Sequence, residues 1–140
     1  MWRMAAVLIA AACLAVLMTA ILLEPSRQGV GTHTRLGLAH CEFLARTSLP
    51  CPTCGMTTSF AHFVRGNLLA SLYVQPMGTV LALGTAVAFW VALYIGVTGQ
   101  PVLRLLRQID GVYYVIPLVT MALLAWGWKM LLQIRGVDGW

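Results

Sequence analysis

Long hydrophobic runs are separated along this chain by one long and one short connection, which carry most of the charged residues. Three runs, residues 4–23, 77–97 and 112–134, consist mainly of Ala, Val, Leu, Ile and Met, and none holds more than one charged side chain. Each has about the 20 residues that an α-helix needs to cross the hydrocarbon core of a bilayer. The pattern predicts an all-α integral membrane protein with three transmembrane helices in a single membrane domain, residues 1–140.

The second and third hydrophobic runs contain residues that indicate how their helices pack and where they end. Glycine in a membrane helix lets neighbouring backbones approach closely, so we expect the helix at 77–97, whose apolar surface is interrupted by Gly78, Gly84 and Gly96, to lie at the centre of the bundle. The third run closes with Trp126, Trp128 and Lys129, residues that are typical of a helix end among lipid head groups. We expect Lys129 to extend its ammonium group to the membrane surface and the tryptophans to anchor the helix there.

Residues 24–76 form a connection far longer than a turn between two crossings requires. Hydrophobic residues recur near helical spacing between Thr57 and Leu72. This spacing predicts a long ordered loop with an interfacial or re-entrant helix, bent or broken at Gly66. Arg65 makes a complete crossing unfavourable, because a charge is costly in hydrocarbon.

Two shorter segments accompany these helices. The hydroxyl groups of residues 57–59 are expected to cap the amino end of the loop helix by accepting its free amide hydrogens. Residues 101–110 combine apolar side chains with Arg104, Arg107 and Asp110, and this pattern predicts a short interfacial helix. An ordinary connecting loop is the alternative there.

Composition excludes a soluble domain. The 140 residues are 60% hydrophobic and 9% charged, with a mean hydropathy of +0.85, whereas soluble domains carry about 25% charged residues. The net charge of +5 is scattered along the chain, which favours a lipid bilayer with anionic head groups as partner and not nucleic acid. The four acidic residues are dispersed, and no phosphate-binding glycine loop or serine nucleophile motif occurs, so the sequence does not indicate an enzyme.

The long connection holds the candidate chemistry, in the pentapeptide Cys51-Pro52-Thr53-Cys54-Gly55 and in a lone cysteine ten positions upstream, Cys41. Proline fixes one backbone angle of such a turn, and glycine accepts the left-handed angle that closes it, which places two thiols on one side. Thiolates in this arrangement suit a tetrahedral zinc or iron site. We predict a metal site, with zinc as the candidate ion, whose ligands are Cys41, Cys51, Cys54 and His40, with His33 or His62 as alternative fourth ligands.

Two other interpretations of the cysteines stay open. The spacing of Cys51 and Cys54 is also that of dithiol oxidoreductases, in which the first thiol lies at a helix amino terminus that lowers its pKa. Pro52 is then expected to be the first residue of that helix, and Cys41 can resolve a mixed disulfide. The remaining interpretation is a structural disulfide between Cys41 and one member of the pair.

Charge bias predicts the orientation in the membrane. With three crossings, the cysteine loop and the carboxyl terminus share a side that carries most of the basic residues, so the positive-inside rule places the loop in the cytosol, beneath the inner cell membrane. Arg3, ahead of the first helix, favours the opposite orientation. A cytosolic loop keeps thiols reduced and available to a metal. Because three helices bury little surface alone, we also expect a protein partner or a homo-oligomer.

These residues resemble a known family. The bacterial membrane family named domain of unknown function 2752 has a similar signature, carried here by Cys41, the segment from Cys51 to Thr57, Arg65-Gly66-Asn67 and Gln75-Pro76-Met77-Gly78. The resemblance covers about residues 41–83. Members commonly carry Arg where this chain has Thr58 and Asn where it has Gln75, so an anion-binding role of that arginine does not carry over. The resemblance implies a small multi-span membrane protein with no established activity.

The sequence therefore leads to two hypotheses about function. In the first, the protein is a non-enzymatic membrane module whose metal-bound or thiol-clamped loop serves the binding of a partner protein. In the second, it is a membrane thiol-disulfide oxidoreductase that acts through Cys51 and Cys54. The lack of paired acid and base groups favours the first hypothesis.

Overall fold

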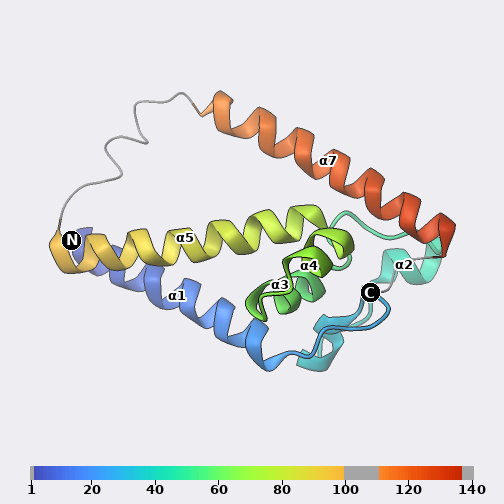
Figure 1. Ribbon diagram of the computed structural model, residues 1–140, viewed down its shortest axis with the longest axis horizontal. Coiled ribbons are helices and arrows are strands. Elements are labelled where there is room, and N and C mark those ends of the chain that lie inside the picture. Colours follow the sequence, from blue (N-terminus) through green and yellow to red (C-terminus); the bar gives the residue numbers. More distant parts are fainter. Residues whose placement is uncertain (1, 100–110, 137–140) are drawn as a thin grey trace.

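The computed structural model describes residues 2–99 and 111–136, and this part of the chain contains helices and no strands (Figure 1). In chain order the elements are α1 (Trp2–Leu22), the 3-10 helix η1 (Thr32–Leu36), α2 (Glu42–Thr47), α3 (Met56–Val64), α4 (Leu68–Val74), α5 (Pro76–Thr98) and α7 (Val112–Arg135). Within the described residues α1, α5 and α7 are long and apolar enough to cross a membrane. The all-α fold class with three spanning helices is confirmed. The helix expected at 101–110 lies outside the described residues.

Helices α1 and α5 are antiparallel and pack side by side (Figure 1). Small residues allow the close approach, since a Cβ atom at Gly96 would lie 3.2 Å from Cγ2 of Val7. At the end away from the cysteine loop, Arg3 donates from Nε to the Gly96 carbonyl and from Nη2 to the Val97 carbonyl, both at 3.1 Å. This guanidinium satisfies carbonyls that the end of α5 leaves free and complements the helix dipole. Helix α5 also contacts α3, α4 and α7, as expected for the centre of the bundle.

The loop helix is divided in two at the expected residue. Helix α3 ends at Val64, Gly66 adopts a left-handed φ of 77°, and α4 begins at Leu68. The expectation that residues 57–59 cap α3 is wrong, because no side chain caps that helix. These hydroxyls instead join the helix to its neighbours: Thr58 Oγ1 lies 2.7 Å from Thr32 Oγ1.

Ser59 is the centre of a second, fully buried group of hydroxyls between α3, α4 and α5. Its Oγ donates to the Ser71 carbonyl at 3.0 Å and lies 3.1 Å from Thr79 Oγ1, while Ser71 Oγ donates back to the Ser59 carbonyl at 2.9 Å. A Cβ atom at Gly78 would lie 2.8 Å from Ser59 Cβ, so glycine is required for this approach. The hydrogen-bonded hydroxyls hold the helix pair α3 and α4 against the first turn of α5.

Arg65 connects the loop to the end of α1. Its Nη2 donates to the Ile21 carbonyl at 2.9 Å and its Nη1 to the Ala61 carbonyl at 2.8 Å. The guanidinium thus satisfies a terminal carbonyl of a spanning helix, as Arg3 does at the other end of the pair. The two arginines mark opposite ends of the bundle formed by α1 and α5.

Helix α7 is attached to the rest of the protein through its carboxyl-terminal half, close to the cysteine loop (Figure 1). Trp126 donates from Nε1 to the Pro50 carbonyl at 3.1 Å, and Trp128 donates to the Tyr73 carbonyl at 2.9 Å. Lys129 is completely buried and donates to the Gly29 carbonyl at 3.4 Å. The expectation that Lys129 extends to the membrane surface is wrong, because its side chain is buried and its ammonium donates to the Gly29 carbonyl of the loop.

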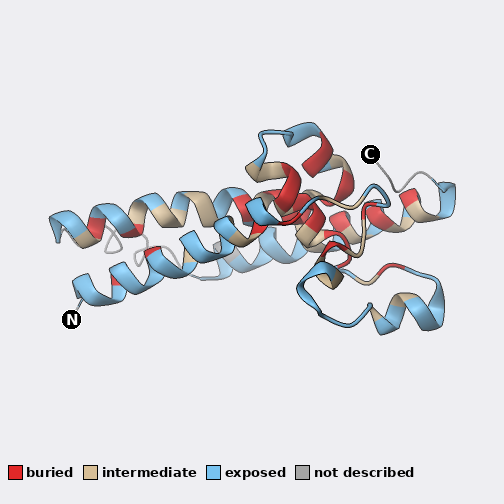
Figure 2. Cartoon of the chain, turned by 90° about the horizontal axis from the view of Figure 1, so that it is seen from below, coloured by how far each residue is buried: buried red, intermediate tan, exposed pale blue. Residues whose placement is uncertain are grey.

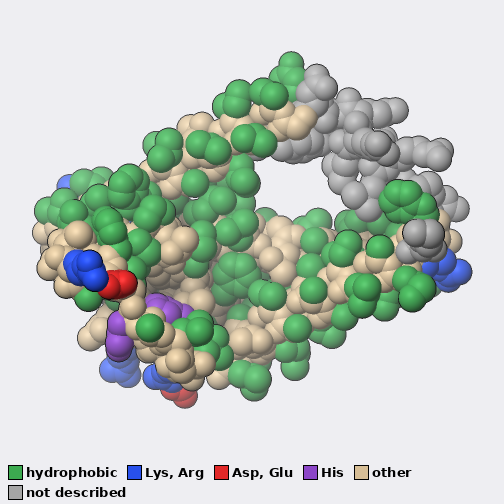
Figure 3. Space-filling view, turned by 180° about the vertical axis from the view of Figure 1, so that it is seen from behind, with side chains coloured by type: hydrophobic (Ala, Val, Ile, Leu, Met, Phe, Trp, Pro, Cys, Tyr) green, Lys and Arg blue, Asp and Glu red, His purple; other side chains and the backbone are tan. Residues whose placement is uncertain are grey.

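Buried residues are densest in the loop region and in the parts of α5 and α7 that adjoin it (Figure 2). In α1 and α5 the buried side chains are mostly small, whereas large hydrophobic side chains such as Leu8, Leu83 and Trp90 face outward. Charged and histidine side chains gather mainly at the loop end, and hydrophobic side chains cover the helices (Figure 3). This distribution fits helices surrounded by lipid, with a compact polar unit at one end.

We expect Trp126→Phe to lower the free energy of unfolding by about 1 kcal/mol, because the Pro50 carbonyl loses its donor. Unfolding by sodium dodecyl sulfate in mixed micelles measures the change. Trp90→Phe, at an exposed position of α5, is the matched control and should change stability by less. If both substitutions lowered the free energy of unfolding equally, the hydrogen bond between Trp126 and the loop would not contribute to stability.

Candidate metal centre

Three cysteines from two separate parts of the loop come together at one point. Cys41 directly precedes α2, whereas Cys51 and Cys54 lie in the turn before α3. The three Sγ atoms all lie within 4.8 Å of one another, and the Sγ atoms of Cys51 and Cys54 are 3.1 Å apart. We call these residues the thiol cluster.

The turn that carries the pair is closed by two backbone hydrogen bonds. Cys54 N–H donates to the Cys51 carbonyl at 3.0 Å, and Met56 N–H donates to the Thr53 carbonyl at 3.2 Å. Gly55 has a φ of 90°, which is the left-handed angle expected of the last residue of the box. The prediction that Pro52 begins the following helix is wrong, since α3 begins at Met56.

A side chain of α7 and one at the junction between α4 and α5 fix the backbone on both sides of Cys51. Trp126 of α7 donates to the carbonyl of Pro50 at 3.1 Å, and Gln75, at the start of α5, donates from Nε2 to the carbonyl of Pro52 at 3.0 Å. Gln75 is only 1% exposed, so this bond is shielded from water. Sequence reasoning missed both contacts, because nothing in the local pattern links either residue to the cysteines.

The two thiols of the pair differ in acidity. Burial raises the pKa of Cys51, but the Thr53 hydroxyl and the thiols of Cys54 and Cys41 form hydrogen bonds that together lower it to about 7. Burial is also the largest effect on the pKa of Cys54, and here it raises the pKa in the same direction as the hydrogen bond to Cys51. Together they raise the pKa of Cys54 to about 12. Cys51 is therefore the thiol that becomes a thiolate most readily.

The cluster suits a metal ion in its donor type and spacing. With a Zn–S bond of about 2.3 Å, tetrahedral geometry places sulfur ligands about 3.8 Å apart, within reach of small movements of these thiols. The structure brings together Cys41, Cys51 and Cys54 but not the expected histidine. His40 is exposed and outside the cluster, and Nε2 of His33 lies 3.2 Å from the Ala39 carbonyl.

Residues 41–90 match the model of the family described as "Protein of unknown function (DUF2752)". We call residues 41–90 the DUF2752 segment. It spans a little over a third of the chain, from the first cysteine of the cluster into α5, and it confirms the resemblance found in the sequence. Comparison with curated proteins and with solved structures gave no match.

A cavity of about 740 Å³ lies between the DUF2752 segment and the residues that precede it, and we call it the polar cavity because most of the residues that line it are polar or charged. Cys41 and Cys54 form part of its wall, together with His40 and, from the preceding residues, His33, Arg27 and Arg35. A small ligand in the cavity can therefore reach two of the three sulfur atoms. A metal held by the cluster would have this cavity as the source of a fourth ligand, either water or an imidazole from its wall.

Proposed function

We propose that this protein is a non-enzymatic membrane module in which Cys41, Cys51 and Cys54 hold one zinc ion that stiffens the loop for a protein partner. The observation that carries the proposal is that the Cys41 sulfur lies within 4.8 Å of the sulfur atoms of a cysteine pair that begins ten positions later in the chain. Thiolate ligands favour zinc over magnesium or calcium. A zinc ion here would close the segment between Cys41 and Cys51, which carries α2.

The closed segment offers a surface for a partner. Large hydrophobic side chains are exposed in this segment at Phe43 and Leu49, and Leu38 is exposed just before it. Exposed apolar groups in a loop held in one shape support protein binding better than a mobile loop does, because less conformational entropy is lost on association. We place this surface on the cytosolic side of the inner membrane, on the basis of charge bias from Arg27, Arg35, Arg46, Arg65 and Arg135.

Elemental analysis of the purified protein, paired with thiol counting, tests the zinc proposal. We expect about one zinc per chain in the wild type and a clear loss in Cys51→Ser, because one of the three thiolates is removed. Cys13→Ser changes a cysteine on α1 outside the cluster and should retain the metal. Metal-free wild-type protein with a reversibly titrating dithiol would contradict the proposal.

The geometry of the pair favours one second candidate, a thiol-disulfide oxidoreductase. The 3.1 Å separation of the Cys51 and Cys54 sulfur atoms allows a disulfide to form with little movement. The Cys51 thiolate would attack a substrate disulfide, form a mixed disulfide and release one substrate thiolate. Cys54 would then lose its proton, attack the Cys51 sulfur and release the second thiolate, so that two electrons pass from the pair to the substrate.

This candidate predicts a pH dependence for the metal-free protein. With a pKa of about 7, Cys51 is about half thiolate at pH 7 and about 1% thiolate at pH 5, so its alkylation by iodoacetamide should slow about fiftyfold. Cys54, with a pKa of about 12, should react far more slowly at either pH. Mass spectrometry of the alkylated peptides measures both rates. A Cys51 rate that is the same at pH 5 and pH 7 would contradict the assignment.

A further inference from the structure

An apolar groove of about 360 Å³ runs along the last turns of α1, on the side that faces the loop. One wall is the face of α1 from Ala15 to Leu23, and the opposite wall contains Leu36, Met56 and Phe60. Because α1 is one of the helices that can span the membrane, this groove lies beside the end of a crossing segment. Its lining is chemically suited to a hydrocarbon chain.

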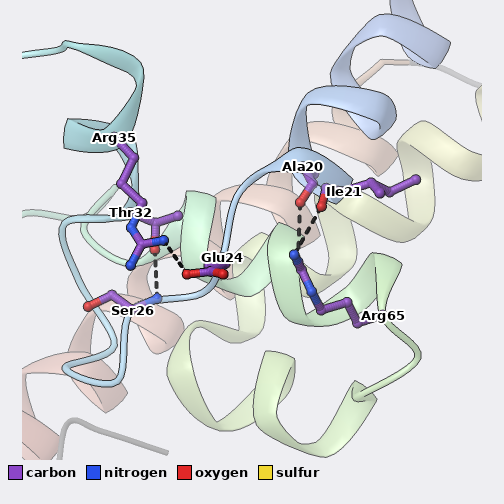
Figure 4. A network of polar contacts seen from close by, with 7 residues as sticks. All are labelled: Ala20, Ile21, Glu24, Ser26, Thr32, Arg35 and Arg65. Atoms are coloured by element: carbon purple, nitrogen blue, oxygen red, sulfur yellow. Dashed lines mark hydrogen bonds and ion pairs between the residues drawn. The ribbon is translucent and has the colours of Figure 1, made fainter.

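The groove adjoins the polar cavity that the thiol cluster lines. Leu23 and Leu36 line the groove, and their neighbours in the chain, Glu24 and Arg35, line the polar cavity. Glu24 and Arg35 form an ion pair of 2.6 Å (Figure 4), and their chain neighbours Leu23 and Leu36 place this pair at the boundary between the two spaces. The two spaces together have an apolar end and a polar end, as an amphiphilic ligand has.

Positive charge predominates at this boundary. Arg35 approaches Glu24 from the loop, and Arg65 donates to the Ile21 carbonyl at the end of α1, as Figure 4 shows. Arg27 lies on the wall of the polar cavity. Arg35 and then Arg65 hold the pKa of Glu24 below its usual value, so this carboxylate is charged and balances one of the three arginines. The net charge around the end of the groove is therefore positive, from Arg27 on the cavity wall and from Arg65, which lines neither space and donates to the Ile21 carbonyl.

We propose that the groove and the adjoining arginines bind one anionic phospholipid, with an acyl chain between α1 and α3 and the phosphate in the polar cavity beside Arg27 and Arg35. A basic pocket between helices at the interfacial end of a crossing is the arrangement that holds anionic lipid head groups. The acyl chain would remain at membrane depth, while the head group would lie in the cavity next to the thiol cluster. This site does not depend on a metal in the cluster.

Native mass spectrometry of the full-length protein in detergent micelles tests the proposal. The protein is titrated with phosphatidylglycerol and with phosphatidylcholine that carry the same acyl chains. We expect the wild type to bind phosphatidylglycerol about fivefold more tightly than phosphatidylcholine. In Arg35→Gln the two lipids should bind with about equal affinity. Arg46→Gln is the matched control, because Arg46 is also exposed and paired with a glutamate but lies outside both spaces. Arg46→Gln should keep the preference.

A second pair of variants tests the groove. Ala15→Phe places a ring in the groove and should weaken binding of both lipids, whereas Ala11→Phe, one turn earlier on an exposed position of α1, should leave binding unchanged. Free glycerol phosphate is expected not to displace phosphatidylglycerol. Equal binding of the two lipids, or an unchanged affinity in Ala15→Phe, would overturn the proposal. Displacement by glycerol phosphate would also overturn it, since the site would then bind a soluble phosphate.

Discussion

Replacement of Cys41 by serine is expected to weaken zinc binding about a hundredfold. Cys41 lies ten positions before the cysteine pair, but its sulfur lies within 4.8 Å of both other sulfur atoms. Structural zinc binds with about 10–16 kcal/mol shared among four ligands, so loss of one ligand costs about 3 kcal/mol, or two orders of magnitude. Competition with a chromophoric chelator measures the affinity.

The same substitution separates the two candidate functions. A dithiol oxidoreductase that uses Cys51 and Cys54 would keep its pair intact in Cys41→Ser, and its reduction of a disulfide substrate would continue. Cys13→Ser, on α1, controls for the general effect of removing a cysteine and should bind zinc as the wild type does. Wild-type zinc affinity in Cys41→Ser would show that the third sulfur is not a ligand.

Replacement of Gly55 by alanine is expected to lower the free energy of unfolding by about 3 kcal/mol. The φ of 90° costs a non-glycine residue about 1–2 kcal/mol. A Cβ atom would also lie 2.8 Å from the Gly29 carbonyl oxygen and 3.3 Å from Cγ1 of Val74, so backbone would have to shift. Unfolding in mixed micelles measures the change in free energy. Zinc analysis of the same variant shows whether the site that includes the adjacent Cys54 still binds the metal.

Gly37→Ala provides the matched control for backbone strain alone. Gly37 also has a left-handed φ, of 77°, but a Cβ atom there would meet no atom within 4 Å. We therefore expect a loss of about 1 kcal/mol, from the backbone angle only. If both alanine variants lowered the free energy of unfolding by the same amount, the close packing of Gly55 against Gly29 would not contribute to stability.

The elements of this fold that depend on local pattern could be predicted from the sequence. The three long helices follow from uninterrupted hydrophobic runs, because a bilayer requires every backbone group to be bonded within its own helix. The division of the loop helix at Gly66 follows from the freedom of glycine to adopt a left-handed angle. The approach of Cys41 to the pair was a hypothesis based on thiol chemistry, and the structure places the sulfur atoms together.

Features that depend on tertiary contacts could not be predicted. Lys129 has the position and flanking tryptophans of a residue at the membrane surface, but the loop folds over it and supplies the Gly29 carbonyl. Ser59 has the position of a helix cap, but it bonds to Ser71 of a helix that packs against it. A polar side chain is satisfied by whichever partner the fold brings near, and sequence spacing gives no information about partners distant in the chain.

X-ray absorption spectroscopy at the zinc edge of the purified wild-type protein tests the central claim, that the thiol cluster is one metal centre. The spectrum reports the type, number and distance of the atoms bound to zinc. We expect three sulfur neighbours at about 2.3 Å, from Cys41, Cys51 and Cys54, with one lighter ligand. Zinc surrounded only by nitrogen and oxygen, or protein that holds no zinc and has a disulfide between Cys51 and Cys54, would contradict it.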